Sequence, residues 1–526
     1  MQRQELLQHL SQPKTYDVAI IGGGATGLGA ALDAAARGYS VVLLESHDFA
    51  KGTSSRATKL VHGGVRYLAQ GNVALVKEAL HERANLLTNA PHLAQPLPFV
   101  MPSYKWWETP FYGAGLKLYD ALGGKISNQA GLGDTEFLSL SETTKLLPTV
   151  QIQGLRGGVK YWDGQFDDAR LALAIARTAV SKGALLVNYC VVENLLHEAD
   201  KVVGLVARDT ETGQTFRVGA RCVINATGVW VDQLRQQDGQ STGRQVKAMV
   251  APSQGVHLVV DRDFWSIDHA LLGPKNEEGR VLFAVPWLGK TILGTTDTPR
   301  GDLAREPEPF ADEVAFILNE AGKYLSRAPQ RSDVRSVWVG LRPLVKPQDD
   351  DGGNTKGLSR EHTILISKSG LVTVTGGKWT TYRAMAEDVV NRCIEARLLI
   401  RTPDGATTHL PLFAAKKSSQ RVSAAPGLHL YGSEAQAVQA LPGADNELGH
   451  GLTEAMVRYA ARFEYARTVE DVLARRSRLL FLDARLAESL ADAVAQILRS
   501  ELGADPSFNP QTQAFKTLAT QYQQLP

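Results

Sequence analysis

Apolar and polar positions at the start of the chain follow a regular order. Residues 18–21 are an apolar run that predicts a buried strand, and an alanine-rich segment without proline then predicts a helix to about Arg37. Gly38 ends this helix, and residues 40–44 form a second apolar run. The pattern therefore predicts a strand, a helix and a second strand within the first 45 residues.

Glycines fill the turn between the first strand and the helix. Gly22, Gly24 and Gly27 have the G-x-G-x-x-G spacing, and Glu45 closes the second strand. In such a unit the glycines permit a tight turn, a close approach to a pyrophosphate and close packing of helix on strand. The terminal acid can accept hydrogen bonds from ribose hydroxyls. The spacing alone also occurs in ordinary glycine-rich turns, but its context predicts a dinucleotide site, without distinguishing NAD from FAD.

The remaining pattern predicts an α/β chain with an antiparallel part and a helical end. Short apolar strands alternate with turns over residues 246–297, as in an antiparallel sheet. Residues 402–425 have the composition of a linker. Helical periods cover residues 72–87, 167–182, 308–325, 380–399, 433–441, 453–466, 469–480 and 484–502, and strands are expected at 184–192, 201–209, 222–224, 363–367 and 371–375.

Composition narrows the function classes. The 526 residues include 57 Lys plus Arg and 55 Asp plus Glu, so net charge gives no case for nucleic-acid binding. The 3 cysteines form no C-x-x-C, which argues against a thiolate metal site or a disulfide framework and fits a reducing compartment. The sequence shows no signal-peptide core and no apolar run long enough for a transmembrane helix.

The segment after Glu45 has small and hydroxyl residues, followed by the pair Gly63-Gly64. A solvent-exposed loop is the ordinary interpretation. Hydroxyls and close-approaching backbone are also what the edge of a flat ring system requires, so this loop is a candidate ring-binding segment.

Several longer motifs point to one family. They are GGGATGLGAALDAAARG, TSSRATKLVHGGVRYL, YWDGQFDDARLALA, NATGVWVDQL, PWLGKTILGTTD, VGLRPL and GGKWTTYRAMAEDVV, together with TVEDVLARRSRLLFLDA near the end. With these motifs nearly the whole chain resembles the FAD-dependent glycerol-3-phosphate dehydrogenases of the quinone-linked, bacterial aerobic type.

The resemblance implies a fold class and a division of the chain. We expect an FAD-binding Rossmann-like α/β domain of the two-dinucleotide-domain flavoprotein type, an antiparallel-sheet substrate or cap domain, and an all-α C-terminal domain. The expected FAD-binding segments are residues 14–100, 160–245 and 335–400. Residues 101–159 and 246–334 would form the cap domain, and residues 401–526 the helical domain.

The same resemblance implies noncovalent FAD and no metal. The residues expected to hold FAD are Gly22, Gly24, Gly27, Glu45, Thr53, Ser54, Ser55, Lys59, Leu60, His62, Gly63, Val191, Val192, Ala226, Thr227, Gly228, Gly376, Gly377, Lys378 and Thr380.

The implied reaction is oxidation of glycerol-3-phosphate to dihydroxyacetone phosphate by hydride transfer to FAD. A lone strand histidine is usually a satisfied core residue, but the resemblance makes His257 the expected base. Arg342 would stabilise the developing alkoxide, with Arg66 and Lys378 also in the catalytic group. Which basic residue meets the phosphate stays open. The expected substrate-binding set is Arg66, Tyr67, Thr295, Thr296, Arg342, Arg360 and Lys378.

Residues 97–125 interleave aromatic residues, including Trp106 and Trp107, with lysines. This composition suits a membrane interface, and an aromatic cap over the flavin cleft is the alternative. The resemblance implies a membrane quinone as electron acceptor and a cytoplasmic protein attached peripherally to the inner face of the membrane. A homodimer is the assembly that we allow for.

Three other functions compete with this expectation. The chain could be a glycerol-3-phosphate oxidase that uses oxygen, or an amine or amino-acid oxidase of similar architecture, although a single carboxylate would not need four converging basic groups. A flavin-bearing binding protein is the alternative outside enzymes, and the near-zero net charge argues against a nucleic-acid partner for it.

Overall fold

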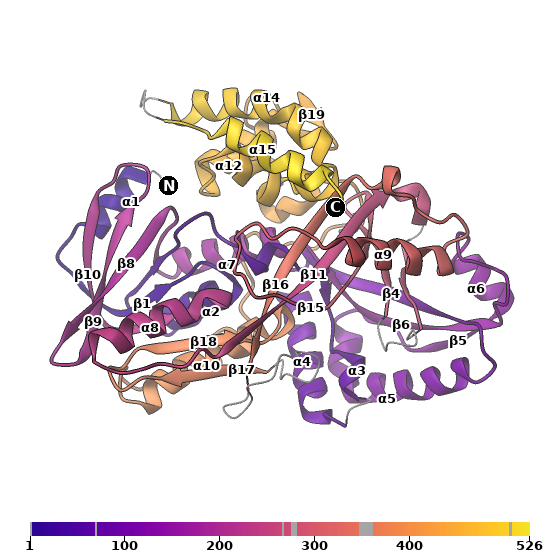
Figure 1. The fold of residues 1–526 in the computed structure, drawn as a ribbon, viewed down its shortest axis with the longest axis horizontal. Helices are drawn as coiled ribbons and strands as arrows, with labels where there is room; N and C mark the ends of the chain where they lie inside the picture. Colours follow the sequence, from indigo (N-terminus) through magenta and orange to yellow (C-terminus); the bar gives the residue numbers. More distant parts are fainter. Residues whose placement is uncertain (1–2, 69–70, 266–267, 275–280, 347–360, 504–507) are drawn as a thin grey trace.

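The structure is a computed structural model that describes residues 3–68, 71–265, 268–274, 281–346, 361–503 and 508–526. It contains two large sheets and a group of C-terminal helices that lies across both of them (Figure 1). No helix in the described part of the chain has the length and apolar character needed to cross a membrane.

The first sheet is built on the predicted strand–helix–strand unit. Strand β1 (Thr15–Ile21) pairs in parallel with β2 (Val41–Leu44) on one side and with β10 (Thr215–Asn225) on the other. Its last four residues are buried, as expected for a parallel strand covered on both faces. Parallel pairs add β7 (Leu185–Val187) and β18 (Val372–Gly376), and antiparallel pairs add β8 (Cys190–Glu198), β9 (Lys201–Asp209) and β17 (His362–Ile366).

Three helices pack together beside this sheet. Helix α2 (Ala25–Ala36) contacts both α7 (Asp168–Ser181) and α10 (Tyr382–Glu395). A Cβ atom on Gly27 would lie 1.9 Å from the Gly22 carbonyl oxygen, and one on Gly29 would lie 3.1 Å from the Tyr382 ring. Glycine at these two positions therefore lets α2 approach both the glycine turn and α10.

The second sheet has ten strands and forms the other half of the molecule. Its strands are β3 (Leu60–Val61), β4 (Ala94–Ser103), β5 (Glu136–Ser139), β6 (Gly157–Phe166), β11 (Val250–Asp261), β12 (Ala270–Leu272), β13 (Phe283–Trp287), β14 (Lys290–Gly294), β15 (Thr298–Pro299) and β16 (Ser336–Val345). The long antiparallel pairs β11–β16 and β4–β6 form its body.

The boundary of this sheet differs from the expected segments. Most of β4 and β6 and the whole of β16 were assigned to the FAD-binding part, yet all three strands pair within the second sheet. A buried apolar strand has the same sequence pattern in either sheet, so the pattern did not show to which sheet each strand belongs. Strand β16 runs from the second sheet to the first, where it contacts β18.

Helices α4 (Val73–Asn89), α5 (Glu108–Gln129), α6 (Leu140–Leu146) and α9 (Ala311–Tyr324) pack with the second sheet or with each other. Other α-helices before the C-terminal group are α1 (Arg3–Leu10), α3 (Val65–Leu68) and α8 (Val231–Ser241). Helix α5 and the neighbouring α3 and α4 lie at the end of the molecule opposite the C-terminal helices (Figure 1).

The C-terminal helices begin after the expected linker. They are α11 (Ala435–Gln439), α12 (Glu454–Phe463), a π-helix (Asp471–Arg476), α13 (Leu479–Leu482), α14 (Ala484–Leu502) and α15 (Thr512–Gln523). A short hairpin of β19 (Glu447–Gly449) and β20 (Leu452–Thr453) precedes α12. The helical periods at 453–466 and 484–502 match α12 and α14, whereas the period at 469–480 is interrupted by the π-helix.

Candidate active site

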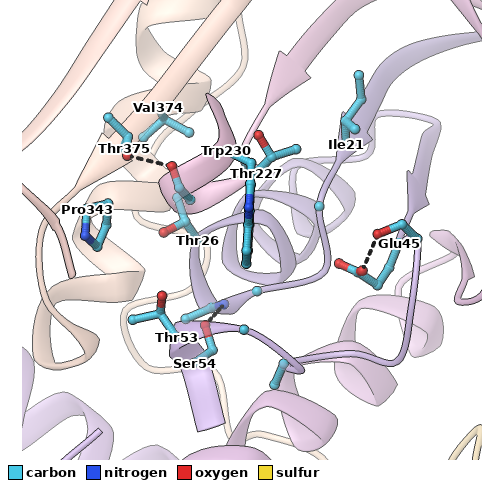
Figure 2. Close-up of a pocket in the computed structure, with 18 of the residues that line it drawn as sticks. Ile21, Thr26, Glu45, Thr53, Ser54, Thr227, Trp230, Pro343, Val374 and Thr375 are labelled. Carbon is cyan, nitrogen blue, oxygen red and sulfur yellow. Dashed lines mark hydrogen bonds between the residues drawn. The ribbon is translucent and has the colours of Figure 1, made fainter. Parts of the chain in front are cut away.

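A cavity lies at the carboxyl ends of β1, β2, β10 and β18. Glu45 and Pro343 lie at opposite ends of it, with Trp230 between them (Figure 2). Ligands of parallel α/β sheets bind at this edge. The residues predicted for FAD that line the cavity are Gly22, Gly24, Glu45, Thr53, Ser54, Val191, Val192, Ala226, Thr227, Gly228, Gly376, Gly377 and Lys378.

Two glycine turns open the cavity to a flat, extended ligand. Gly22 has φ +109°, and a Cβ there would lie 2.6 Å from the Ala226 carbonyl oxygen. At the other turn Gly376 and Gly377 have φ +84° and +76°, and a Cβ on Gly377 would lie 2.3 Å from Met385 Sδ. Both turns require residues without side chains, so backbone can approach a bound dinucleotide closely. The residues present therefore fit FAD.

Glu45 and Ser54 order the two loops around the first turn. One oxygen of the Glu45 carboxylate accepts a hydrogen bond from the Gly23 amide at 2.7 Å, and the other accepts one from the His47 amide at 2.9 Å. The Ser54 hydroxyl accepts from the Ala25 amide at the start of α2, at 2.9 Å (Figure 2). Glu45 thus shapes the glycine turn as well as facing the cavity.

The other residues predicted for FAD lie behind the cavity wall. Gly27, Ser55, Leu60 and Thr380 are packed or hydrogen-bonded within the wall, and Thr380 Oγ1 accepts from the His62 amide at 3.2 Å. The Gly63 amide donates to the Tyr119 hydroxyl at 2.7 Å.

Lys59 is the clearest departure from expectation. Its side chain is fully buried and its Nζ donates to Asp168 Oδ2 and to the Ser55 carbonyl oxygen, both at 2.7 Å. Burial lowers the pKa of Lys59 to about 7, against the opposing effect of the Asp168 charge. Lys59 therefore holds the loop of residues 53–58, called the flavin loop below, to Asp168, and it is not among the residues that line the cavity.

Arg342 lies on β16 directly before the cavity residue Pro343. Its guanidinium group donates to Asp297 Oδ1 at 3.0 Å, to the Thr296 carbonyl oxygen at 3.0 Å and to Thr295 Oγ1 at 3.4 Å. A Cβ on Gly255 would lie 2.2 Å from this guanidinium group, so the glycine makes room for it. About a fifth of the Arg342 side chain, 22%, is exposed.

His257 lies on β11, where it pairs with Trp338 of β16, and is 2% exposed. Its Nε2 is 2.9 Å from the Thr58 hydroxyl, and its ring stacks on Trp338 with centroids 4.9 Å apart. Burial, followed by the charges of Lys59 and Arg342, holds the pKa of His257 well below its usual value. The imidazole is therefore neutral at pH 7 and can accept a proton, and a bound dianion would raise its basicity.

Thr295 and Thr296 differ in burial and in their hydrogen-bond partners. Thr296 is buried, and its hydroxyl donates to Glu313 at 2.8 Å and accepts from the Val256 amide at 3.0 Å. Thr295 is half-buried and contacts Arg342. The structure therefore favours Thr295 over Thr296 as a substrate contact.

Three predicted substrate residues cannot be placed. Arg360 lies outside the described residues. Arg66 and Tyr67 lie on α3, but their side chains are outside the described part of the structure.

Four further residues of the site escaped the sequence patterns. Trp230 and Arg305 line the cavity, with the Arg305 guanidinium 4.6 Å from the Trp230 ring centroid. The Thr58 hydroxyl contacts His257, and Gly255 leaves room for the Arg342 guanidinium group. Thr58 and Gly255 adjoin predicted residues and could have been suspected, whereas no local signal marks Arg305.

Comparison with known proteins agrees with this geometry. The family model described as "FAD dependent oxidoreductase" matches residues 17–383, and the model "C-terminal domain of alpha-glycerophosphate oxidase" matches residues 374–508. The mitochondrial glycerol-3-phosphate dehydrogenase of Bos taurus is 41% identical, covering 96% of this chain and 73% of the relative. That of Schizosaccharomyces pombe is 38% identical, covering 96% and 87%.

A solved structure extends the likeness to the fold. The glycerol-3-phosphate dehydrogenase of Bacillus halodurans, solved in complex with FAD, is 29% identical with a TM-score of 0.77. The superposition covers 99% of this chain and 98% of that chain. The chain belongs to the FAD-dependent oxidoreductases and, among them, to the glycerol-3-phosphate dehydrogenases.

Proposed function

We propose that this chain oxidises glycerol-3-phosphate to dihydroxyacetone phosphate and passes the electrons to a membrane quinone. The observation that carries the proposal is a cavity that fits FAD and ends at Pro343, directly after Arg342 on β16, with His257 on the neighbouring strand β11. FAD, when bound, supplies the acceptor for the hydride that leaves carbon 2 of the substrate. The family relationship supports the same reaction.

Each residue near the pair has a distinct part in the proposal. His257 takes the hydroxyl proton, since its imidazole is neutral at pH 7. Arg342 lies where a planar fork of donors stabilises the developing alkoxide, with Thr295 beside it. Lys378, at the second glycine turn, adds positive charge at the cavity. Arg66, Tyr67 and Arg360 remain proposed substrate contacts on sequence grounds, for the phosphate or the hydroxyls.

The proposal of a membrane quinone as electron acceptor draws on aromatic side chains exposed on the protein surface. Trp106 is 78% exposed, Phe111 66% and Trp107 39%, and neither Trp106 nor Phe111 lines the cavity. Exposed aromatic rings beside Lys105 suit the headgroup region of a membrane. These rings support attachment to a membrane surface. The inner face of the cytoplasmic membrane and quinone as the acceptor are proposed from the family resemblance. The cap alternative is less favoured because these rings point to solvent.

The acceptor is tested by following reoxidation. Protein reduced with glycerol-3-phosphate under nitrogen should regain its flavin absorbance on addition of a short-chain quinone. In air without quinone, turnover and peroxide release should stay low. Rapid turnover in air with one peroxide released for each dihydroxyacetone phosphate would make the chain an oxidase and contradict the quinone assignment.

A further inference from the structure

Arg478 of the C-terminal domain reaches into the base of the flavin loop. It lies between the π-helix and α13, in the left-handed region at φ +67°, and its side chain is fully buried. One terminal nitrogen donates to the Ser55 carbonyl oxygen at 2.8 Å and to Asp168 Oδ1 at 2.9 Å. The other donates to the Ala474 carbonyl oxygen at 2.9 Å.

Lys59 completes a closed ring of contacts with Arg478. Its Nζ donates to the same Ser55 carbonyl oxygen and to the second oxygen of Asp168. That second oxygen also accepts from the Ala57 amide at 3.1 Å. Lys59 has φ +66°, a backbone conformation that residues other than glycine rarely adopt. The buried side chains of Lys59, Asp168 and Arg478 therefore fix a strained turn over residues 55–59.

The turn carries the hydroxyl that contacts the candidate base. Thr58 Oγ1 lies 2.9 Å from Nε2 of His257, and Nδ1 of His257 has no hydrogen-bond partner among the described residues. The stacked Trp338 ring restrains the plane of the imidazole but does not distinguish the two orientations related by a half-turn about the Cβ–Cγ bond. The position of the Thr58 hydroxyl therefore sets the orientation of the His257 ring.

We propose that Arg478 is a positioning residue for proton abstraction: it fixes the turn at residues 55–59, and Thr58 of that turn orients His257. The proposal rests on the proposed function, because it takes His257 as the base. It makes the C-terminal domain part of the active site. A misplacement of about 1 Å in a catalytic group lowers a rate by about a hundredfold.

A double-mutant cycle on anaerobic flavin reduction tests the coupling. Arg478→Lys keeps the charge but loses the fork of donors, and Thr58→Val keeps the shape but loses the hydroxyl. Each should slow reduction by glycerol-3-phosphate about tenfold, and the double variant should also be slowed about tenfold because both changes break one chain of contacts.

The matched control is Arg170→Lys. Arg170 is buried at the same domain interface, where its guanidinium donates to Glu464 at 2.7 Å, and none of its hydrogen bonds or ion pairs in the described structure reaches residues 55–59. This variant should lower the thermal midpoint as Arg478→Lys does, while leaving the reduction rate within about twofold. A structural role for Arg478 alone would make the two variants alike in rate.

A second readout does not depend on turnover. Titration of FAD with apoprotein, followed by FAD fluorescence, should show weaker binding in Arg478→Lys, since the turn adjoins Ser54 at the cavity. Thr58→Val should bind FAD as the unaltered protein does. If the double variant reduced its flavin about a hundredfold more slowly, the two changes would act independently, and the proposal would be overturned. Unchanged reduction in Thr58→Val would overturn it even if Arg478→Lys failed to fold.

The two proposals fail in different ways. Unaltered protein that binds FAD but is not reduced by glycerol-3-phosphate contradicts the proposed function. The FAD titration then still bears on Arg478, and unchanged FAD affinity in Arg478→Lys would overturn its role.

Discussion

Arg342 is held between Asp297 and the threonine pair with its guanidinium group partly open to solvent. Arg342→Ala should lower kcat/KM for glycerol-3-phosphate by about a hundredfold, as loss of a charged transition-state contact does. FAD content, read from the flavin absorbance, should not change. Arg335, which pairs with Asp261 just before β16, is the matched control, and Arg335→Ala should retain full turnover. Equal activity in both variants would remove Arg342 from the mechanism.

Arg305 brings an exposed positive charge to the FAD cavity. Because a charge-assisted contact to phosphate contributes about 1.4 kcal/mol or more, Arg305→Ala should weaken FAD binding about tenfold, measured by titrating apoprotein with FAD. Arg327 also lies over an aromatic ring, that of Phe264, but lines no part of the cavity. If Arg327→Ala weakened FAD binding as much, the effect would be one of net charge alone.

Sequence predicts the residues whose chemistry is local and misses those that act through distant contacts. Gly22, Gly24 and Glu45 form one turn, so their spacing is informative. Arg478 reaches Asp168 across 310 positions of sequence, and no spacing rule describes such a contact. Lys59 matches a flavin motif, but only its contacts show that it serves the loop and not the cavity.

At the scale of elements, the segment that leads into α5 carries the exposed aromatic side chains of Trp106 and Trp107. Replacing Trp106 and Trp107 with serine should weaken binding to vesicles of anionic phospholipid, measured by sedimentation, because these rings would no longer enter the interface. Activity with a soluble acceptor should be unchanged. Ile400, which is 70% exposed just before the linker, provides the control Ile400→Ser. Loss of soluble activity with intact vesicle binding would favour the aromatic cap.

The first β-strand, helix and strand were predicted because two apolar runs flank an alanine-rich segment without proline, with glycines at the turns. Allotting strands to sheets was harder: β16 pairs with β11 in the second sheet, although its motif suggested the FAD-binding part. Pairing of strands depends on contacts between distant segments, which periodicity does not encode. The π-helix likewise interrupts a segment whose pattern predicts a regular helix.

At the scale of the whole molecule, buried histidines tie stability to pH. His92 is 2% exposed beside Gly432, and burial, with a smaller effect of Arg170, lowers its pKa to about 3. Between pH 6.5 and about 3 the unfolded chain binds a proton at this residue and the folded chain does not, so acid favours unfolding.

His92→Leu tests this linkage. From pH 6.5 to 5 the histidine should cost about 2 kcal/mol of stability, and the variant should lose correspondingly less. Thermal midpoints at pH 7 and 5 measure the difference. The exposed His81 serves as control, and His81→Leu should keep the steeper loss of the unaltered protein. If the thermal midpoints of all three proteins fell equally between pH 7 and 5, His92 would not be the source of the acid sensitivity.

The central claim is that glycerol-3-phosphate reduces FAD bound in the cavity, with His257 as the base and Arg342 at the reacting oxygen. Its most direct test is to mix the FAD-loaded protein with glycerol-3-phosphate in the absence of oxygen and follow flavin absorbance near 450 nm. The account predicts prompt bleaching, formation of one dihydroxyacetone phosphate for each flavin, and greatly slowed bleaching in Arg342→Ala. Persistent absorbance with glycerol-3-phosphate, together with bleaching by an amine or amino acid, would contradict it.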